Sequence, residues 1–498
     1  MKDQGIGSWP ARRARMTPRN VALIEGDDTV TYADLDDRVR GLAAGLHQRG
    51  VTAGDRVAFL GLNSIAFVET MFAVARLGAI FVPVNTRLAQ TELAYVLTDS
   101  GTSVLLHQDQ FSAVIDAAAP ESVTSIPVGD GADATAQLRS GTDDPASEVG
   151  VALDDVFMLQ YTSGTSGRPK GVMLTHGNVT WNVMNLLVDV DLRSREVALV
   201  TAPMFHTAAL NQVFLPVFLK GGTSLLEGRF DAGRAIELIE QHRVTMLFGV
   251  TSMYQSIAAQ PAFADADLSS LTHALSGGAP IPESLLTLYA DRGLGLFQGY
   301  GMTETSPGAT MLREADSIRK LGTAGTPCFF SDVRVVDATG ADVAVGQSGE
   351  VWVHGPNVSP GYWHNETATA ATFTDGWVHS GDIAVMDDEG YVRIVDRLKD
   401  MYISGGENVY PAEVESAIYS HDAVAECAVI GVPDQQWGEV GRAFVRLTPG
   451  ATLTHEELLE HLAPRLARYK LPRSTVFVAD LPHNASGKLL RARLKEDA

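Results

Sequence analysis

Between about residues 38 and 300, helix-like periodicity of apolar positions alternates with short, continuous apolar runs. The clearest runs lie at 57–60, 103–106, 198–200, 246–248 and 296–297. Runs this short, separated by amphipathic stretches of helix length, predict strands that alternate with helices. That order is typical of an α/β protein with a largely parallel sheet, in which ligands bind beyond the carboxyl ends of the strands.

The pattern changes twice further along the chain. After about residue 322, short alternating runs such as 333–336 and 350–353 are separated by glycine-containing turns, which predicts an antiparallel, barrel-like piece. Beyond 397–400 come two strand-like runs, a helix from Glu456 with a capping box formed by Thr454 and Glu457, and a basic tail. This last part is typical of a small α+β domain.

We therefore expect an α/β protein of two domains. The large N-terminal domain, residues 1–396, should contain layered mixed sheets flanked by helices, plus the barrel-like β piece. Residues 397–400 should form a hinge, and residues 401–498 a small, mobile α+β domain. Residues 119–150 are acidic, small and weakly apolar, so we predict a surface connection without chemistry.

Composition limits the partners. A chain of 498 residues with 45% hydrophobic and 20% charged residues is globular and long enough for two or more packed units. Its net charge of −22 argues against sequence-independent binding to nucleic acid or anionic lipid and favours small ligands. The longest apolar segment, 67–84, is interrupted by Glu69 and Arg76, and the N-terminus lacks the apolar core of a signal peptide.

The two cysteines, Cys328 and Cys427, are too few for a disulfide framework and fit no metal-ligand spacing. Their number is compatible with a reducing compartment, so we expect a cytoplasmic protein without an integral membrane segment.

The segment YTSGTSGRPKG, residues 161–171, combines hydroxyls, glycines and Lys170. It follows the apolar run 156–159 and precedes a helix-like segment from Asn178, which predicts a strand-to-helix loop. Glycines allow close backbone approach, and hydroxyls, amides and an ammonium group bind oxyanions. The alternative is a polar turn without function. The loop is no Walker A motif, because Gly171 follows Lys170 where Ser or Thr is required.

Two more glycine-rich turns, 276–280 and 298–304, end strand-like runs. In the second, Tyr300, Thr303 and Glu304 would suit a flat base, a phosphate and Mg²⁺. Neither a G-x-S-x-G elbow nor a G-x-G-x-x-G after the first strand is present, which disfavours hydrolases and dinucleotide enzymes. His455 and His461 are six residues apart and do not share a helical face, so they are no metal motif.

Six ordered motifs carry a resemblance to a known family. They are YTSGTSGRPKG (161–171), PMFH (203–206), GYGMTE (299–304), SGD (380–382), DRLKDMYISGGENVYPAEVE (396–415) and NASGK (484–488). Together they resemble the acyl-CoA synthetase branch of the adenylate-forming superfamily over essentially the whole chain. The segments GIGSWPARRARM and PMFHTAAL are similar to those of actinobacterial feruloyl-CoA synthetases and mycobacterial fatty-acyl-CoA synthetases.

The resemblance implies a nucleotide site. The residues expected to bind ATP or AMP are Thr162, Ser163, Gly164, Thr165, Ser166, Gly167, Lys170, Gly278, Ala279, Pro280, Gly299, Tyr300, Gly301, Met302, Asp382 and Arg397. Thr303 would contact the α-phosphate, Asp382 would accept hydrogen bonds from the ribose hydroxyls, and Glu304, with Thr165, would hold Mg²⁺.

The resemblance also implies the catalytic groups, which are Lys488, His206, Glu304 and Thr303. Lys488 would reach in from the small domain and neutralise the two anions that must meet, the acid and the α-phosphate. The acyl pocket would be lined by His206, Ala208, Ala209, Gln212, Gly278 and Gly301. The small domain would pivot at Lys399, and Ser404, Gly405 and Gly406 would line the tunnel for CoA.

The expected activity is that of an ATP-dependent acid–CoA ligase that forms acyl-AMP and pyrophosphate, then acyl-CoA and AMP, with ATP, Mg²⁺ and CoA as partners. The chain ends ten residues after Lys488, so we expect no fused carrier domain. The absence of arginine after His206 disfavours a dicarboxylate. A hydroxycinnamic or other aromatic acid is preferred on resemblance alone. A medium- or long-chain fatty acid, an amine acceptor, and, as the weakest alternative, a non-catalytic binding protein stay open, and a homodimer is compatible with the sequence.

Overall fold

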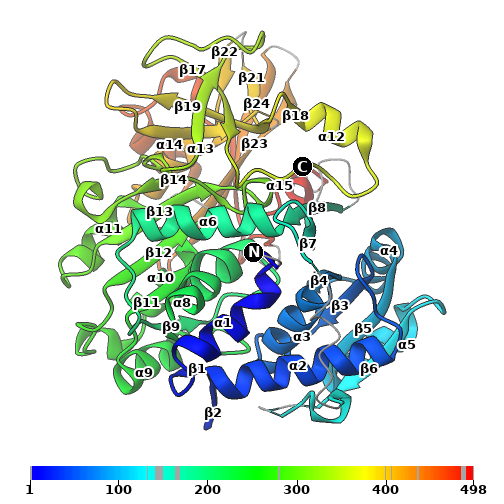
Figure 1. Ribbon diagram of the computed structural model, residues 1–498. Coiled ribbons are helices and arrows are strands. Elements are labelled where there is room, and N and C mark those ends of the chain that lie inside the picture. Colours follow the sequence, from blue (N-terminus) through cyan, green and yellow to red (C-terminus); the bar gives the residue numbers. More distant parts are fainter. Residues whose placement is uncertain are drawn as a thin grey trace.

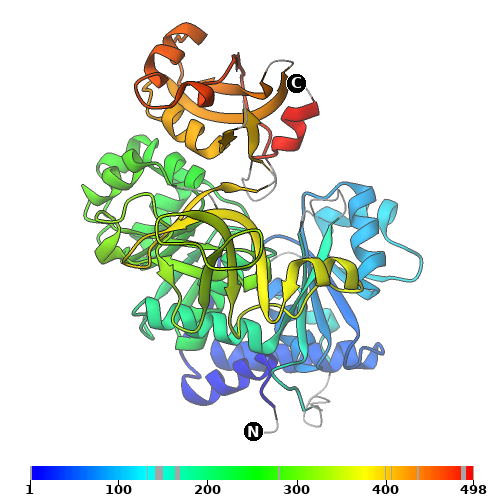
Figure 2. The same cartoon turned by 90° about the horizontal axis from the view of Figure 1, so that it is seen from above.

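The structure is a computed structural model that describes residues 3–129, 131, 133–140, 150–162, 169–278, 281–398, 400–404, 407–434, 437–483 and 489–496. Its described strands form four sheets, of six, nine, five and five strands. The first three belong to the N-terminal part of the chain and the fourth to a small C-terminal domain (Figures 1 and 2).

The six-stranded sheet is built from the first strand-like runs. Its order is β6 (Thr124–Val128), β5 (Thr102–Gln108), β3 (Arg56–Leu60), β4 (Ile80–Val84), β7 (Val156–Thr162) and β8 (Lys170–Thr175). All pairs are parallel except β7 and β8, which are antiparallel. The helices of this region are α1 (Trp9–Met16), α2 (Tyr32–Gln48), α3 (Ile65–Arg76), α4 (Gln90–Ser100) and α5 (Ser112–Ala118).

The nine-stranded sheet is parallel in its centre and antiparallel at both ends. Its order is β15 (Thr326–Pro327), β14 (Gly308–Leu312), β13 (Leu296–Gly301), β12 (His273–Gly277), β11 (Met246–Gly249), β9 (Val197–Val200), β10 (Thr223–Leu226), β1 (Val21–Glu25) and β2 (Asp28–Thr31). Its region contains α6 (His176–Asp189), α7 (Thr207–Ala209), a π-helical turn (Leu210–Phe214), α8 (Leu215–Lys220), α9 (Ala232–His242), α10 (Thr251–Ala258) and α11 (Glu283–Ala290). The predicted mixed α/β layers are thus confirmed.

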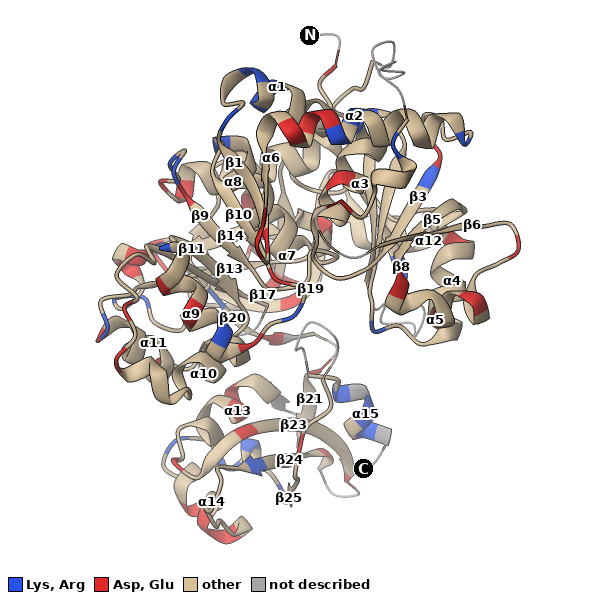
Figure 3. Cartoon of the chain, turned by 90° about the horizontal axis from the view of Figure 1, so that it is seen from below, with Lys and Arg blue, Asp and Glu red and all other residues tan. Residues whose placement is uncertain are grey.

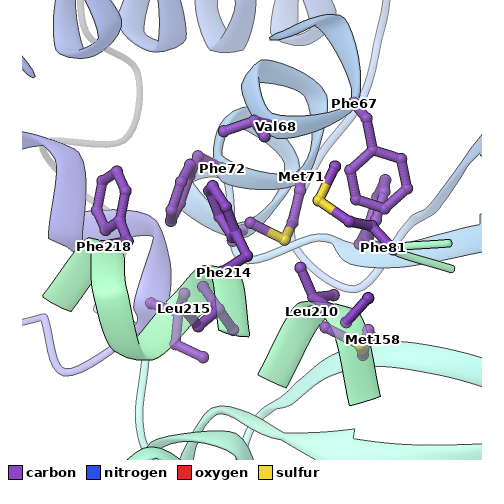
Figure 4. Packing of buried hydrophobic residues seen from close by; sticks show 14 of the residues in the cluster. Phe67, Val68, Met71, Phe72, Phe81, Met158, Leu210, Phe214, Leu215 and Phe218 are labelled. Atoms are coloured by element: carbon purple, nitrogen blue, oxygen red, sulfur yellow. The ribbon is translucent and has the colours of Figure 1, made fainter. Parts of the chain in front are cut away.

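Helix α3 and the helical segment 210–220 share one continuous core (Figure 4). Almost every residue of α3 is buried, including Glu69, whose carboxylate pairs with Arg38 and Arg139. The ring of Phe72 lies 4.7 Å from that of Phe218 and 6.3 Å from that of Phe214. The π-helical turn continues the segment that begins at His206. This packing holds the turn against α3, a helix of the six-stranded sheet.

The antiparallel piece after residue 322 is also confirmed. It is a five-stranded sheet of β16 (Asp332–Val336), β17 (Ser348–His354), β18 (Phe373–Thr374), β19 (Trp377–Met386) and β20 (Val392–Arg397), with helix α12 (Glu366–Thr372) beside it. All its strand pairs are antiparallel.

The small C-terminal domain is α+β, as predicted. It contains β21 (Tyr402–Ser404), β22 (Glu407–Val409), β23 (Val424–Asp434), β24 (Gly438–Leu447), β25 (Ser474–Phe477), α13 (Pro411–Tyr419), α14 (His455–Leu462) and α15 (Arg491–Glu496). Thr454 and Glu457 form the expected capping box of α14. The domain has its own core around Tyr402 and Leu458, and Figure 2 shows it apart from the N-terminal sheets. The hinge at 397–400 stays a prediction, and Lys399 lies outside the described residues.

Two local predictions are wrong. Residues 163–169 connect two antiparallel strands, β7 and β8, rather than a strand and a helix; the apolar residues 172–174 form a strand that the periodicity of the following helix obscured. Residues 119–150 are not only a surface connection, because β6 pairs with β5 and Leu138 is buried. Arg139 also makes a 3.1 Å ion pair with the fully buried carboxylate of Glu69 on α3.

Replacing Phe72 by alanine tests the shared core. Because the ring is fully buried, we expect Phe72→Ala to lower the free energy of unfolding by about 3–5 kcal/mol. Chemical denaturation of the purified variant measures this value. Phe329, whose side chain is 67% exposed, supplies the control: Phe329→Ala should change stability by less than about 0.5 kcal/mol. Equal losses in the two variants would contradict the assignment of this core.

Candidate active site

The turn after β13 carries a buried carboxylate. Glu304 lies in a short 3-10 helix, Thr303–Thr305, and its residue is only 6% exposed. The Tyr362 hydroxyl donates a hydrogen bond of 2.6 Å to Glu304 Oε1, and the Ser359 amide donates one of 2.8 Å to the Glu304 carbonyl. Among the described residues, Tyr362 is the one hydrogen-bond donor to the Glu304 carboxylate, which has no ion-pair partner there. A buried anion in this condition suits a cationic ligand.

A second hydrogen bond links Tyr300, which is predicted to bind the base, with Asp382, which is predicted to bind the ribose. The Tyr300 hydroxyl donates a hydrogen bond of 2.7 Å to Asp382 Oδ2, although the two residues are 82 positions apart. Asp382 is 7% exposed and lies opposite Arg397 in the β19–β20 pair. Glu350 accepts a 2.9 Å hydrogen bond from the amide of Gly381, whose φ of +69° is a left-handed conformation that favours glycine.

Lys170 is the first residue of β8, and its side chain lies over the ring of Tyr362, the residue that donates to Glu304. It pairs with Thr162 across β7 and β8, so the two ends of the loop are fixed by strand register. Its Nζ lies 4.8 Å from the centre of the Tyr362 ring, a cation–π contact. Burial and the negative charge of Glu304 raise the pKa of Tyr362 above its ordinary value, so the hydroxyl keeps its proton and acts as a donor.

The glycines of the site differ in their roles. Gly277 and Gly299 face each other at the carboxyl ends of β12 and β13. Gly278 has a φ of +84° and open space where a side chain would stand, which suits close approach of a ligand. A Cβ on Gly301 would come within 1.6 Å of the Pro307 carbonyl oxygen, so the turn itself requires this glycine. Met302 is half-buried beside it.

The candidate acyl wall begins at His206 and continues into the π-helical turn. Such turns are frequent at functional sites. Burial, with a smaller effect of the Arg87 charge, lowers the pKa of His206 to about 4, and its Nε2 is buried with no hydrogen bond among the described residues. Ala208 is half-buried, whereas Ala209 and Gln212 are buried. The Gln212 amide nitrogen lies 3.0 Å from the position that a Cβ on Gly308 would take.

Asn211 joins this wall to the turn that follows β13, although its Oδ1 is buried without a hydrogen bond among the described residues. Its Nδ2 donates a 3.1 Å hydrogen bond to the carbonyl of Ser306, and its own carbonyl accepts one of 3.0 Å from Asn182. The acyl segment is thereby tied to the turn that carries Glu304.

Sequence reasoning missed three supporting residues: Tyr362, Asn357 and Glu350. The Asn357 amide donates to the carbonyls of Thr305 and Gly308 at 2.8 and 2.7 Å, and its backbone carbonyl accepts from the Ser306 hydroxyl. No sequence motif marks these positions. Contacts in space reveal them: Asn357 and Tyr362 meet the turn at 304–308, and Glu350 meets the Gly381 amide.

Several predicted residues lie outside the described residues: Ser163, Gly164, Thr165, Ser166, Gly167, Ala279, Pro280, Lys399, Gly405, Gly406 and Lys488. For Arg397 only the backbone is described, and Ser404 is buried at the end of β21. The chain on either side of Lys488 is anchored. His483 Nε2 lies 2.6 Å from Glu426 Oε1, and Arg491 forms an ion pair of 2.6 Å with Glu415. Figure 3 shows basic residues gathered on α15, directly after Lys488 in the chain.

The chemistry of Glu304 fits Mg²⁺, which prefers carboxylate oxygens. Among the described residues, the one cluster of three potential ligands is instead Asp387, Asp388 and Glu389. It is a poor candidate, because Lys320 already pairs with Asp387 at 2.7 Å and Glu389 at 2.6 Å. The described helices include no candidate for a transbilayer segment.

A sheet with a parallel centre, a buried carboxylate and a tyrosine–carboxylate pair at its strand ends is compatible with a nucleotide-dependent ligase of the adenylate-forming class. Comparison with known families agrees. The AMP-binding enzyme family matches residues 10–363, and the AMP-binding enzyme C-terminal domain matches residues 413–488. The chain belongs to the AMP-binding enzyme family, among its AMP-forming acid–CoA ligases.

Individual relatives cover nearly the whole chain. A feruloyl-CoA synthase of Amycolatopsis sp is 52% identical over 495 residues, 99% of each chain. A long-chain-fatty-acid–CoA ligase of Mycobacterium tuberculosis is 40% identical over 499 residues, 99% of this chain and 98% of the relative. The solved o-succinylbenzoate CoA synthetase of Bacillus subtilis, in complex with ATP and magnesium ion, has a TM-score of 0.89 at 34% identity and covers 98% of this chain and 99% of its own. ATP, Mg²⁺ and CoA are the cofactors and co-substrates of this family, as predicted.

The lowered pKa of His206 predicts a pH dependence of stability. The unfolded chain binds this proton near pH 6.5, whereas the folded chain binds it only near pH 4. Between these values the unfolded state holds more protons, so the free energy of unfolding should fall as pH decreases from about 6.5 to 4. Replacing His206 by asparagine should remove about 3 kcal/mol of that fall. Denaturation series at several pH values measure it.

The control is His364→Asn, on an exposed side chain, which should keep the wild-type slope. An unchanged slope in the His206→Asn variant would show that this imidazole titrates normally in the folded protein.

Proposed function

We propose that this acid–CoA ligase acts on an aromatic acid of the hydroxycinnamate type, through the residues that converge at the carboxyl ends of β12 and β13. The observation that carries the site assignment is that Tyr300 and Glu304, four residues apart at the end of β13, each form a tyrosine–carboxylate hydrogen bond, with Asp382 and Tyr362 respectively, and that Lys170 lies over the Tyr362 ring. The substrate class is supported by the 52% identity to a feruloyl-CoA synthase and by the small, uncharged residues after His206.

In the first half-reaction, the carboxylate oxygen of the acid attacks the α-phosphorus of ATP and pyrophosphate leaves. Lys170 and the loop 162–167 hold the β- and γ-phosphates, Thr303 contacts the α-phosphate, and Asp382 accepts hydrogen bonds from the ribose hydroxyls. Gly278, Ala279 and Tyr300 line the base. Two anions approach each other, so Lys488 must supply positive charge between them. Glu304 and Thr165 would hold Mg²⁺, which neutralises phosphate charge when bound.

In the second half-reaction, the CoA sulfur attacks the acyl carbonyl and AMP leaves. The acyl-adenylate hydrolyses in water, so one site must change shape without opening to solvent. Rotation at Lys399 would withdraw Lys488 and bring Ser404, Gly405 and Gly406 to the pantetheine path. With its pKa near 4, His206 is neutral at physiological pH and borders the acyl group without adding a second charge.

A different acid as substrate and a different acceptor are separate alternative hypotheses. Identity to a fatty-acid ligase favours a fatty acid as the second candidate, and an amine in place of CoA is a third. Both cysteines are free and buried, in keeping with a reducing compartment, and we propose a cytoplasmic location.

An acid panel decides among these candidates. Ferulate, coumarate, benzoate, octanoate and palmitate are each incubated with ATP, Mg²⁺ and either CoA or an amine; pyrophosphate release and product mass are measured. We expect kcat/KM for ferulate or coumarate with CoA to exceed that for both fatty acids by at least about 10-fold, because a ring and a chain demand pockets of different shape. A preference for palmitate would show that the substrate is a fatty acid rather than an aromatic acid. An amide product would show that the acceptor is an amine rather than CoA. If no acid releases pyrophosphate although ATP binds, the chain is a binding protein.

Neutralising Lys488 should separate the two half-reactions. In Lys488→Ala, adenylation measured by pyrophosphate release should fall on the order of 10²–10³-fold or more, because a single electrostatic donor is lost at the transition state. Transfer from chemically prepared acyl-AMP to CoA should fall far less. Lys495→Ala, on α15 a few residues further along, should leave both rates at the wild-type level. Wild-type adenylation in Lys488→Ala would remove this lysine from the chemistry.

A further inference from the structure

Tyr362 connects two parts of the site that the sequence motifs treat separately. Its hydroxyl donates a 2.6 Å hydrogen bond to Glu304 Oε1, and its ring faces the Lys170 ammonium at 4.8 Å. Both Tyr362 and Glu304 are only 6% exposed. One aromatic side chain therefore contacts both the basic end of the anion loop and the carboxylate expected to hold the cation.

The backbone of Tyr362 is fixed to the strand that carries Lys170. Residue 362 forms an antiparallel bridge with Val172. On either side of it, the Trp363 amide donates to the Gly171 carbonyl at 2.8 Å, and the Met173 amide donates to the Gly361 carbonyl at 3.0 Å. The position of Tyr362 is thus set by β8, whereas that of Glu304 is set by the turn after β13.

The side chain of Tyr362 is held as well. Its ring packs edge-on against Phe373 at 5.8 Å, and its amide donates a 3.0 Å hydrogen bond to the Thr369 hydroxyl. A phenol locked by packing and by a backbone bridge presents its O–H in one direction, which is what a supporting residue of a metal-binding carboxylate requires.

We propose that Tyr362 is a positioning residue for cation binding at Glu304. Its attachment to β8 also fixes the carboxylate relative to Lys170. By donating to Oε1, the phenol orients the carboxylate so that Oε2, which accepts no hydrogen bond among the described residues, faces the ligand. Partners of this kind change metal affinity or activity by about 10–100-fold when removed. This inference rests on the proposed nucleotide site.

The test is Tyr362→Phe, which removes the hydroxyl and keeps the ring that faces Lys170. Thermal unfolding is followed with saturating ATP while Mg²⁺ is titrated, so the readout needs neither an acid nor turnover. We expect the Mg²⁺ concentration for half-maximal stabilisation to rise about 10-fold or more. Stabilisation by AMP without Mg²⁺ should stay at the wild-type level, because the Tyr300–Asp382 pair is untouched.

Tyr32→Phe is the matched control. Tyr32 is fully buried, and its hydroxyl donates to the Gly222 carbonyl at 2.6 Å, far from this site in the fold. It should lose a similar amount of thermal stability without any shift in the Mg²⁺ titration. If Tyr362→Phe behaves in the same way as Tyr32→Phe, the hydroxyl is only structural and the proposal is overturned.

Two further variants keep the test decisive if Tyr362→Phe is unstable. Thr369→Val removes the hydroxyl that accepts the Tyr362 amide and should shift the Mg²⁺ titration in the same direction, by less. In Glu304→Gln, adding Tyr362→Phe should cause no further shift, since contacting residues are not additive. Additive shifts, or no shift in Thr369→Val, would contradict the proposal. The acid panel judges the proposed substrate independently, because this titration contains no acid.

Discussion

The structure depends on one electrostatic constraint, the repulsion between a carboxylate and a polyphosphate that must be brought into contact. A protein with a net charge of −22 cannot attract such ligands by its overall field, so positive charge has to be delivered locally. In the proposed function, Lys170 would supply it from a strand whose register is fixed, and Lys488 from a second domain. The buried carboxylates of Glu304 and Asp382 each accept a hydrogen bond from a tyrosine hydroxyl, and would hold a cation and the ribose hydroxyls.

The large domain meets this constraint by bringing chain segments together at one edge. The carboxyl ends of β12 and β13 present glycines at Gly277, Gly278 and Gly299, which leaves room for a flat ligand beside the backbone. The antiparallel sheet brings Asp382 to Tyr300, and the segment 357–362 clamps the turn at 303–308 through amide and hydroxyl groups. Because each tie is a buried hydrogen bond, loss of one partner would leave a polar group unsatisfied in the interior.

The segment after His206 and the turn that carries Glu304 are joined by a hydrogen bond. Asn211, in the π-helical turn, donates to the Ser306 carbonyl, while Phe214 and Phe218 pack the same segment against α3. The proposed acyl wall and the turn that carries Glu304 are therefore linked to each other and anchored in the core that contains α3.

The sequence by itself determined the class of fold, the order of its parts and the identity of most charged groups. Short apolar runs at 57–60 and 246–248 can only be buried as strands when amphipathic helices cover them, and loops rich in glycine and hydroxyls keep their chemistry in any context. Periodicity failed at 163–175, where a strand directly precedes a helix, and at β6, whose pairing rather than its composition makes it a strand. Only the tertiary structure decided that Tyr362, Asn357 and Glu350 belong to the site, and that Asn211 faces Ser306. These roles arise from contacts between residues 31 to 95 positions apart, and local sequence carries no record of which distant groups a side chain will meet.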